Sequence, residues 1–150
     1  MDACRTAVRL GAKEVYVIYR RTEKEMPAEE IEIKESKEEG VTYKFLTNPL
    51  EIHSQNGKVS GMTLQLMELG EPDEKGRRKP VGTGKFKTIK VNSVIGAIGQ
   101  TIDWGELDVG ALKTATKGVA MADPVTLQTA QEDIFVGGDC ATGPKYTIDA

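Results

Sequence analysis

The sequence has little histidine or cysteine and no long apolar run. Its 150 residues include a single histidine, His53, which excludes a metal site built from a histidine cluster. The two cysteines, Cys4 and Cys140, lie far apart and outside any Cys-x-x-Cys motif, so a dithiol relay is not supported. Free cysteines fit a reducing compartment, and we expect a cytoplasmic location. No segment approaches the roughly 20 apolar residues of a membrane-spanning helix.

Composition and charge narrow the class of protein further. Hydrophobic residues make up 39% and charged residues 29% of the chain, which is typical of a soluble globular domain. The formal net charge of −3 argues against nucleic acid as the main partner, although basic residues concentrate at 20–21 and 75–79. These values predict a protein with one ordinary core and no membrane or nucleic-acid partner. They do not by themselves indicate an enzyme.

The first third of the chain alternates between helix and strand patterns. Residues 2–10 carry an apolar stripe at helical spacing, and residues 14–19 form a continuous β-rich run typical of a buried parallel strand. Residues 28–39 predict a second helix, with Pro27 at its first position and Gly40 just beyond its end. Residues 41–46 predict another strand. This order predicts an α/β fold.

In the middle of the chain, apolar and polar residues alternate, which is the pattern of a strand with one solvated face. Residues 50–54 and 59–69 flank Asn56-Gly57, a strong signal for a two-residue hairpin turn. A charged loop at 70–80 and a strand at 86–91 would complete a three-stranded antiparallel meander.

Two apolar runs follow the meander. Residues 94–99 predict a buried parallel strand that ends in a glycine turn, and 133–139 a short buried strand that closes on two glycines and an acid. Residues 119–127 have strand character on both sides of Asp123-Pro124, and 147–150 resemble the start of a helix.

Arg20 and Arg21 follow the first predicted strand and are the first candidate binding site. In βαβ dinucleotide sites this position recognises the adenosine ribose, and an arginine there accommodates a 2′-phosphate. A guanidinium suits phosphate because it stays charged and donates hydrogen bonds in pairs. The alternative is a pair of solvated arginines at the end of a strand.

The glycines of the two later runs are the second group of candidates. Gly137 and Gly138 would let the backbone approach a ligand, and the Asp139 carboxylate could accept a hydrogen bond from a ribityl hydroxyl. Gly99 and Gln100 would place bare backbone at the carboxyl end of a sheet. The alternative for both groups is an ordinary turn after a strand.

Several short stretches spread over the whole chain resemble one family in order and spacing. They are residues 1–7, 9–12, 19–22, 25–28, 67–73, 76–78, 97–100 and 135–139. Together they closely resemble the glutamate synthase small (beta) subunit family and are similar to the reductase portion of dihydropyrimidine dehydrogenase. The resemblance implies a partial Rossmann-like, three-layer FAD/NAD(P)-binding domain over residues 1–98, with the antiparallel meander at about 50–91. Residues 99–150 would be a C-terminal piece of the FAD-binding domain.

The resemblance also implies cofactors, partners and roles for particular residues. In that family NADPH reduces FAD, and electrons leave through iron-sulfur clusters to a large subunit or another electron-acceptor domain. Arg20 and Arg21 would bind the NADPH 2′-phosphate, and Gly138 and Asp139 would lie against the FAD ribityl-pyrophosphate. The backbone at Thr147 and Ile148 would lie near the flavin ring, and Gly99 and Gln100 where the chain crosses between the nucleotide domains. No acid-base residue is required, because the cofactors carry the chemistry.

The sequence also departs from the family pattern. The Gly-x-Gly-x-x-Gly/Ala loop that precedes the matching region in the family is not present, nor are the first FAD-binding βαβ unit and the cysteine-rich iron-sulfur segment. We therefore expect a fragment of an NADPH-dependent flavin oxidoreductase that alone binds NADPH weakly, holds no FAD and is inactive. In the intact family domain, a strand that is missing here would lie between the strands at 14–20 and 94–99. The open slot that it leaves would be filled by a second copy in a homodimer, or by residues 134–136. The alternative function is a non-catalytic module for oligomerisation or protein contact through the meander and its charged loop.

Overall fold

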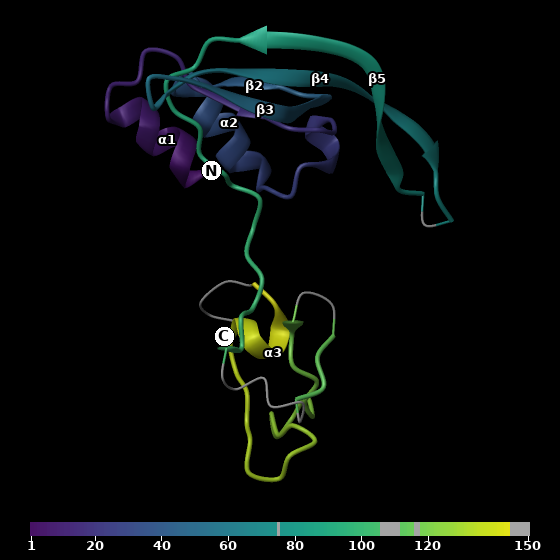
Figure 1. Cartoon of the computed structure of the whole chain (residues 1–150). Coiled ribbons are helices and arrows are strands. Elements are labelled where there is room, and N and C mark those ends of the chain that lie inside the picture. Colours follow the sequence, from purple (N-terminus) through teal and green to yellow (C-terminus); the bar gives the residue numbers. More distant parts are fainter. Residues whose placement is uncertain (75, 106–111, 116–117, 145–150) are drawn as a thin grey trace. The chain divides into compact units, whose positions relative to one another are not determined.

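The computed structural model describes residues 1–74, 76–105, 112–115 and 118–144 (Figure 1). The chain divides into two compact units, residues 1–97 and 98–150. This division lies one residue from the expected boundary after residue 98. The assignment of the two parts to two cofactors stays a prediction.

The first unit begins with two helices and a short parallel pair of strands. Helix α1 spans Asp2–Arg9 and α2 spans Glu30–Glu38, while strands β1 (Tyr16–Ile18) and β2 (Thr42–Lys44) pair in parallel. A 3-10 helix, η1 (Glu23–Glu25), follows β1. Helix α2 buries Ile33 and Ser36, and it begins at Glu30 with Glu29 as its N-cap. Pro27 therefore precedes the helix, and its expected place at the first helical position is wrong.

The rest of the first unit is an antiparallel meander in the order β3-β4-β5 (Figure 1). Its strands are β3 (Thr47–Gln55), β4 (Lys58–Pro72) and β5 (Arg78–Ile89). Asn56 and Gly57, with φ of 52° and 73°, form the predicted turn between β3 and β4, in which both central residues need positive φ. Met62 and Leu64 on β4 are 3% and 1% exposed and form part of the core. The expected loop at 70–80 is shorter than predicted, because β4 continues to Pro72 and β5 already begins at Arg78.

The buried parallel strand expected at residues 94–99 is wrong. This segment has no strand hydrogen bonds among the described residues, and Ile95 and Ile98 are 65% and 98% exposed. A parallel strand needs a neighbour that supplies its hydrogen bonds and covers its side chains. In the part of the chain that the structure describes, β1 pairs with β2 alone, so no such neighbour is available.

The second unit contains isolated β-bridges in place of the expected strands. The bridges join Thr114 to Ala120, Ala122 to Thr129, and Gln128 to Phe135. The buried strand expected at 133–139 is wrong, because Phe135 is 61% exposed, although Val136 is 9% exposed and belongs to the core. The strand character expected at 119–127 is likewise reduced to bridges, because the turn at Asp123 interrupts it.

Segment 134–136 pairs inside the second unit. Its backbone is held by hydrogen bonds from the Thr129 amide to the Ile134 carbonyl and from the Val136 amide to the Leu127 carbonyl, each 2.9 Å long. The backbone hydrogen bonds of this segment are thus made within the second unit. The expected homodimer stays a prediction. A single helical turn, α3 (Asp139–Thr142), follows Gly138, and the helix start expected at 147–150 lies outside the described residues.

An ion-pair cluster links α1 to α2 in the first unit. Arg5 of α1 donates from Nε and Nη2 to Glu39 Oε1 at 2.9 and 2.6 Å, and its Nη1 lies 2.8 Å from Glu35 Oε2. Arg9 Nη2 donates to the same Glu39 oxygen at 2.8 Å. The hydrogen bond from Arg5, followed by that from Arg9, lowers the pKa of Glu39 below its ordinary range.

This cluster predicts a pH dependence of stability. Because the pKa of Glu39 is lower in the folded state than in the unfolded state, its contribution is complete above the unfolded pKa and is lost as pH falls through the folded pKa. We expect the wild-type chain to lose more stability than Glu39→Gln between neutral and acid pH, as measured by urea unfolding. The control is Glu38→Gln, which removes an exposed carboxylate whose nearest amine, on Lys34, is 3.9 Å away. Equal acid sensitivity of the wild type and Glu39→Gln would contradict the prediction.

Candidate functional site

The structure places Arg20 and Arg21 directly after β1, at the carboxyl end of the parallel pair. Backbone hydrogen bonds hold the chain at Tyr19 and at Arg21, on either side of Arg20. The Tyr19 amide donates to the Lys44 carbonyl at 3.0 Å, and the Leu46 amide donates to the Arg21 carbonyl, also at 3.0 Å. Ligands of open α/β sheets bind outside the carboxyl ends of parallel strands. Arg20 and Arg21 therefore lie at the end of the strands where such ligands bind, and their role as an anion-binding pair stays a prediction.

Neither arginine is neutralised by a carboxylate in the described part of the chain. Arg20 is exposed and Arg21 is half-buried, and no ion pair joins either of them to a described carboxylate. The Nε atom of Arg21 is buried and has no hydrogen-bond partner. A buried donor without a partner is costly, so a shift of this side chain toward an acceptor would be favourable.

The nearest acidic residues along the chain are bound elsewhere. Lys37 Nζ donates to both carboxylate oxygens of Glu23, at 2.7 and 2.6 Å. The amide and hydroxyl of Thr22 donate to Glu25 Oε2, at 3.0 and 2.5 Å. The hydrogen bond from the Thr22 hydroxyl is the main cause of the lowered pKa of Glu25. The carboxylate is therefore charged, but it is already hydrogen-bonded to Thr22. The two arginines thus keep their positive charge available to a ligand.

The short helix η1 holds these acidic residues in place and was not foreseen from the sequence. Its backbone is anchored to the residue directly after β1, because the Tyr19 hydroxyl donates to the Glu25 carbonyl at 2.7 Å. A threonine followed three residues later by a glutamate is the sequence pattern of a helix start. The pair Thr22 and Glu25 fits that pattern and could have predicted η1.

The glycine-acid turn of the second unit also has a defined geometry. Gly138 has φ 58° and ψ −145°, a backbone conformation that is open essentially to glycine alone. Its carbonyl accepts hydrogen bonds from the amides of Ala141 and Thr142, at 2.9 and 3.0 Å. Asp139 begins α3 with its side chain exposed. The second unit is anchored nearby, where the Ala120 amide donates to the Cys140 carbonyl at 2.8 Å.

The remaining candidates are less informative. Gly99 and Gln100 are exposed and lie at the start of the second unit, where Gly99 has φ 90°. Thr147 and Ile148 lie outside the described residues. The structure therefore brings Arg20 and Arg21 together in the first unit and Gly138 and Asp139 together in the second, and each pair is described in its own unit.

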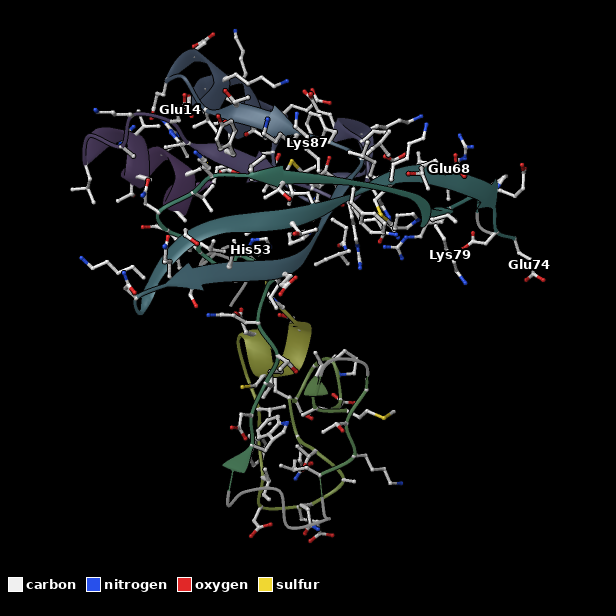
Figure 2. All side chains as sticks on the ribbon, turned by 45° about the horizontal axis from the view of Figure 1, so that its top comes forward. Glu14, His53, Glu68, Glu74, Lys79 and Lys87 are labelled. Atoms are coloured by element: carbon white, nitrogen blue, oxygen red, sulfur yellow. The ribbon has the colours of Figure 1, made fainter. Side chains whose placement is uncertain are left out.

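The described residues do not form a metal site or a membrane-spanning helix. His53 lies on β3, where its Nε2 is 2.8 Å from the Thr63 hydroxyl of β4, in line with its expected place on a hairpin strand (Figure 2). Over residues 1–74, 76–105, 112–115 and 118–144, no three histidine, cysteine, aspartate or glutamate residues are grouped as a metal site would require. Nor does any helix in those ranges have the length and apolar character needed to cross a membrane.

Comparison with known proteins identifies the family. The profile described as pyridine nucleotide-disulphide oxidoreductase matches residues 1–150. The chain is 42% identical over 153 residues to the NADP(+)-dependent formate dehydrogenase subunit beta of Moorella thermoacetica, covering all of this chain and 21% of that protein. It is 39% identical over 160 residues to the glutamate synthase [NADPH] small chain of Escherichia coli, covering all of this chain and 33% of that protein. The resemblance found in the sequence is thus confirmed.

Solved structures confirm the partial Rossmann-like fold. Thioredoxin reductase of T. acidophilum has a TM-score of 0.70 at 21% identity, over 95% of this chain and 41% of that chain. FprA of Mycobacterium tuberculosis in complex with NADPH has a TM-score of 0.56 at 18% identity, over 96% of this chain and 35% of that chain. The chain spans about a fifth to a third of the length of the two curated relatives above. By its sequence and its fold, the chain belongs to the pyridine nucleotide-disulphide oxidoreductase family.

Proposed function

We propose that the chain supplies the adenosine end of an NADPH site in a flavin-dependent oxidoreductase, with Arg20 and Arg21 bound to the 2′-phosphate. The observation that carries the proposal is the unneutralised arginine pair after β1, with the Nε of Arg21 buried and unpartnered. A phosphate offers several acceptor oxygens and two negative charges to guanidinium donors. The two relatives described above support this choice, because their names specify NADP(+) and NADPH.

The residues present fit an adenosine 2′-phosphate on chemical grounds. A ribose 2′-hydroxyl would instead call for an aspartate or glutamate at this position. The nearest carboxylates, on Glu23 and Glu25, are bound to Lys37 and Thr22 and are not available for that role. Arg20 and Arg21 would therefore favour NADPH over NADH by charge and hydrogen bonding.

The second unit is proposed to contribute to a flavin site in the same protein. Gly138 has no side chain and is half-buried, and Asp139 presents an exposed carboxylate directly after it. These groups would bind and orient the ribityl-pyrophosphate part of FAD. NADPH would supply a hydride and the flavin would accept it, so the protein groups would need only to bind and orient. Passage of electrons to an iron-sulfur partner is proposed from the resemblance alone.

The test is a comparison of 2′,5′-ADP (adenosine 2′,5′-bisphosphate) with 5′-AMP by isothermal titration calorimetry. These ligands differ in the 2′-phosphate, so the ratio of their affinities isolates the contribution of that group. We expect the wild-type chain to bind 2′,5′-ADP at least about tenfold more tightly, because each charge-assisted hydrogen bond contributes about 1.5–3 kcal/mol. The preference should disappear in Arg20→Ala/Arg21→Ala.

The matched control is Lys13→Ala/Lys34→Ala, which removes two exposed positive charges elsewhere in the first unit. It should keep the preference for 2′,5′-ADP. A wild-type chain that binds both ligands equally, or a control variant that loses the preference as fully as the arginine variant, would contradict the proposed function.

A further inference from the structure

The positive charge of the chain is concentrated on one strand and its flanks. Residues 75–102 contain seven lysines and arginines and no aspartate or glutamate, although the whole chain carries a net charge of −3. Four of these lysines, Lys79, Lys85, Lys87 and Lys90, lie on β5 or directly after it. Figure 2 shows Lys79 and Lys87 well apart along the strand. The strand therefore presents positive charge over most of its length.

None of this charge is neutralised within the described part of the chain. No described carboxylate lies within ion-pair distance of the four lysines, and all four are exposed. Arg78 differs, because its guanidinium donates to the carbonyls of Gly70 and Leu69 at 2.8 and 2.9 Å. These hydrogen bonds join β5 to β4. The lysines have no comparable structural role.

Strand β5 is also an edge strand. It pairs with β4 on one side and has no neighbour on the other side in the described chain (Figure 1). An edge strand presents a row of backbone donors and acceptors to which an extended peptide can add. Lysines on an edge strand disfavour pairing with an uncharged strand, because the lysine charge would be buried. They disfavour pairing with a basic strand, because like charges repel. The same charges favour an acidic strand, so they would select among partners.

The surroundings of β5 fit a peptide better than a nucleic acid. Phe86 is 59% exposed but stands between Lys85 and Lys87, so it projects from the opposite face of the strand. It is the only aromatic residue between Leu46 and Asp103, and one ring does not make a platform for successive bases. The open backbone edge, in contrast, has a direct use in binding a peptide.

A hollow of about 450 Å³ lies at the end of β5 and supplies a second feature. Lys58 and Lys90 line it, together with the polar side chains of Gln55, Asn56, Ser60 and Asn92. Two lysines and several amide and hydroxyl groups could receive an acidic side chain. The hollow adds two positive charges near the end of β5, but its lining from the β3-β4 turn lies on the paired side of the strand and not on the free edge.

We propose that the outer edge of β5 binds an extended acidic segment of a partner protein by strand addition, with Lys79, Lys85, Lys87 and Lys90 as its charge complement. The regular part of the free edge, residues 86–89 beyond the register shift and away from Pro80, supplies the hydrogen bonds. The lysines require that the partner be negatively charged. The proposal does not depend on the cofactor site, since it uses neither Arg20 nor Arg21.

The test uses a short fluorescent peptide of alternating glutamate and valine, whose binding to the 150-residue chain is followed by anisotropy. We expect saturable binding that weakens with added salt, and slower hydrogen exchange of the β5 amides in the complex. The variant Lys85→Glu/Lys87→Glu should bind at least about tenfold more weakly. Methylation of alternate peptide nitrogens should weaken binding as much, because it removes the hydrogen bonds of the added strand.

Matched controls separate the proposal from general electrostatics and from misfolding. Lys13→Glu/Lys34→Glu makes the same change of charge away from β5 and should bind the peptide as the wild type does. Circular dichroism should show that both variants remain folded. The proposal is overturned by any of three results: no saturable binding, equal loss in the two variants, or tighter binding of a single-stranded oligonucleotide than of the peptide.

Discussion

Replacing Leu64 with alanine should lower the free energy of unfolding of the first unit by about 3 kcal/mol, within the range of about 2–5 kcal/mol for buried leucines. Leu64 is 1% exposed and lies on the central strand β4, opposite Pro49 of β3 and Lys87 of β5. Strands on both sides hold the backbone, so it cannot readily close the cavity that the substitution leaves. The loss is therefore expected to include a cavity cost as well as lost apolar burial.

The measurement is urea unfolding followed by far-ultraviolet circular dichroism, which reports the strands of the meander. Leu50→Ala is the matched control, because Leu50 lies on the same sheet but is 51% exposed. It should cost less than about 1 kcal/mol, since little apolar surface is returned to water. Equal losses from the two substitutions would show that Leu64 does not belong to the core.

The second large effect is expected at Gly138. Its φ of 58° and ψ of −145° place it where a side chain is strongly disfavoured, so Gly138→Ala should cost about 1–3 kcal/mol. The change would act on the second unit through the turn that precedes α3. If that turn also orients Asp139 toward a flavin, the substitution would disturb the proposed site as well as the stability of the unit.

Tryptophan fluorescence provides the measurement for this unit. Trp104 is the only tryptophan in the chain, and its Nε1 donates to the Gly118 carbonyl at 2.8 Å. The urea midpoint of its emission should fall in Gly138→Ala and hold steady in Gly137→Ala. Gly137 is a suitable control because it does not have positive φ, and an added Cβ there would meet nothing within 4 Å. A wild-type midpoint in Gly138→Ala would rule out strain at this turn.

The elements that could be predicted from the sequence are those decided by local chemistry. The turn at Asn56-Gly57 is specified by two residues that tolerate positive φ, and it fixes the pairing of β3 with β4. Arg20 and Arg21 were placed correctly after β1 because strand and helix patterns alternate clearly there. In both cases the sequence pattern that makes the prediction lies within a few residues of the turn or strand end that it predicts.

The elements that were missed depend on distant or unusual context. Segment 94–99 has the composition of a buried strand, but burial needs a neighbouring strand, which composition does not reveal. Strand β5 was predicted too short because Pro80, Gly82 and Gly84 interrupt its pattern. An edge strand tolerates such residues, since one side of its backbone needs no partner.

The candidate site shows the same limit. The sequence indicated which residues could bind phosphate, but not that their charge would remain available. That property depends on Lys37 of α2 reaching back to Glu23, and on the Thr22 hydroxyl binding Glu25. The first contact spans fourteen positions and joins α2 to η1, so no local pattern reports it.

The topology of the meander has a consequence for the order in which the first unit folds. Each of its strands pairs with the strand next to it in the sequence, so the ladders can close one after another from the tight turn outward. Such local pairings lose little chain entropy in their search and form quickly. The parallel pair of β1 and β2 must instead wait until the intervening segment, including α2, has been arranged. We therefore expect the meander to form before the parallel pair of β1 and β2, which precedes the two arginines.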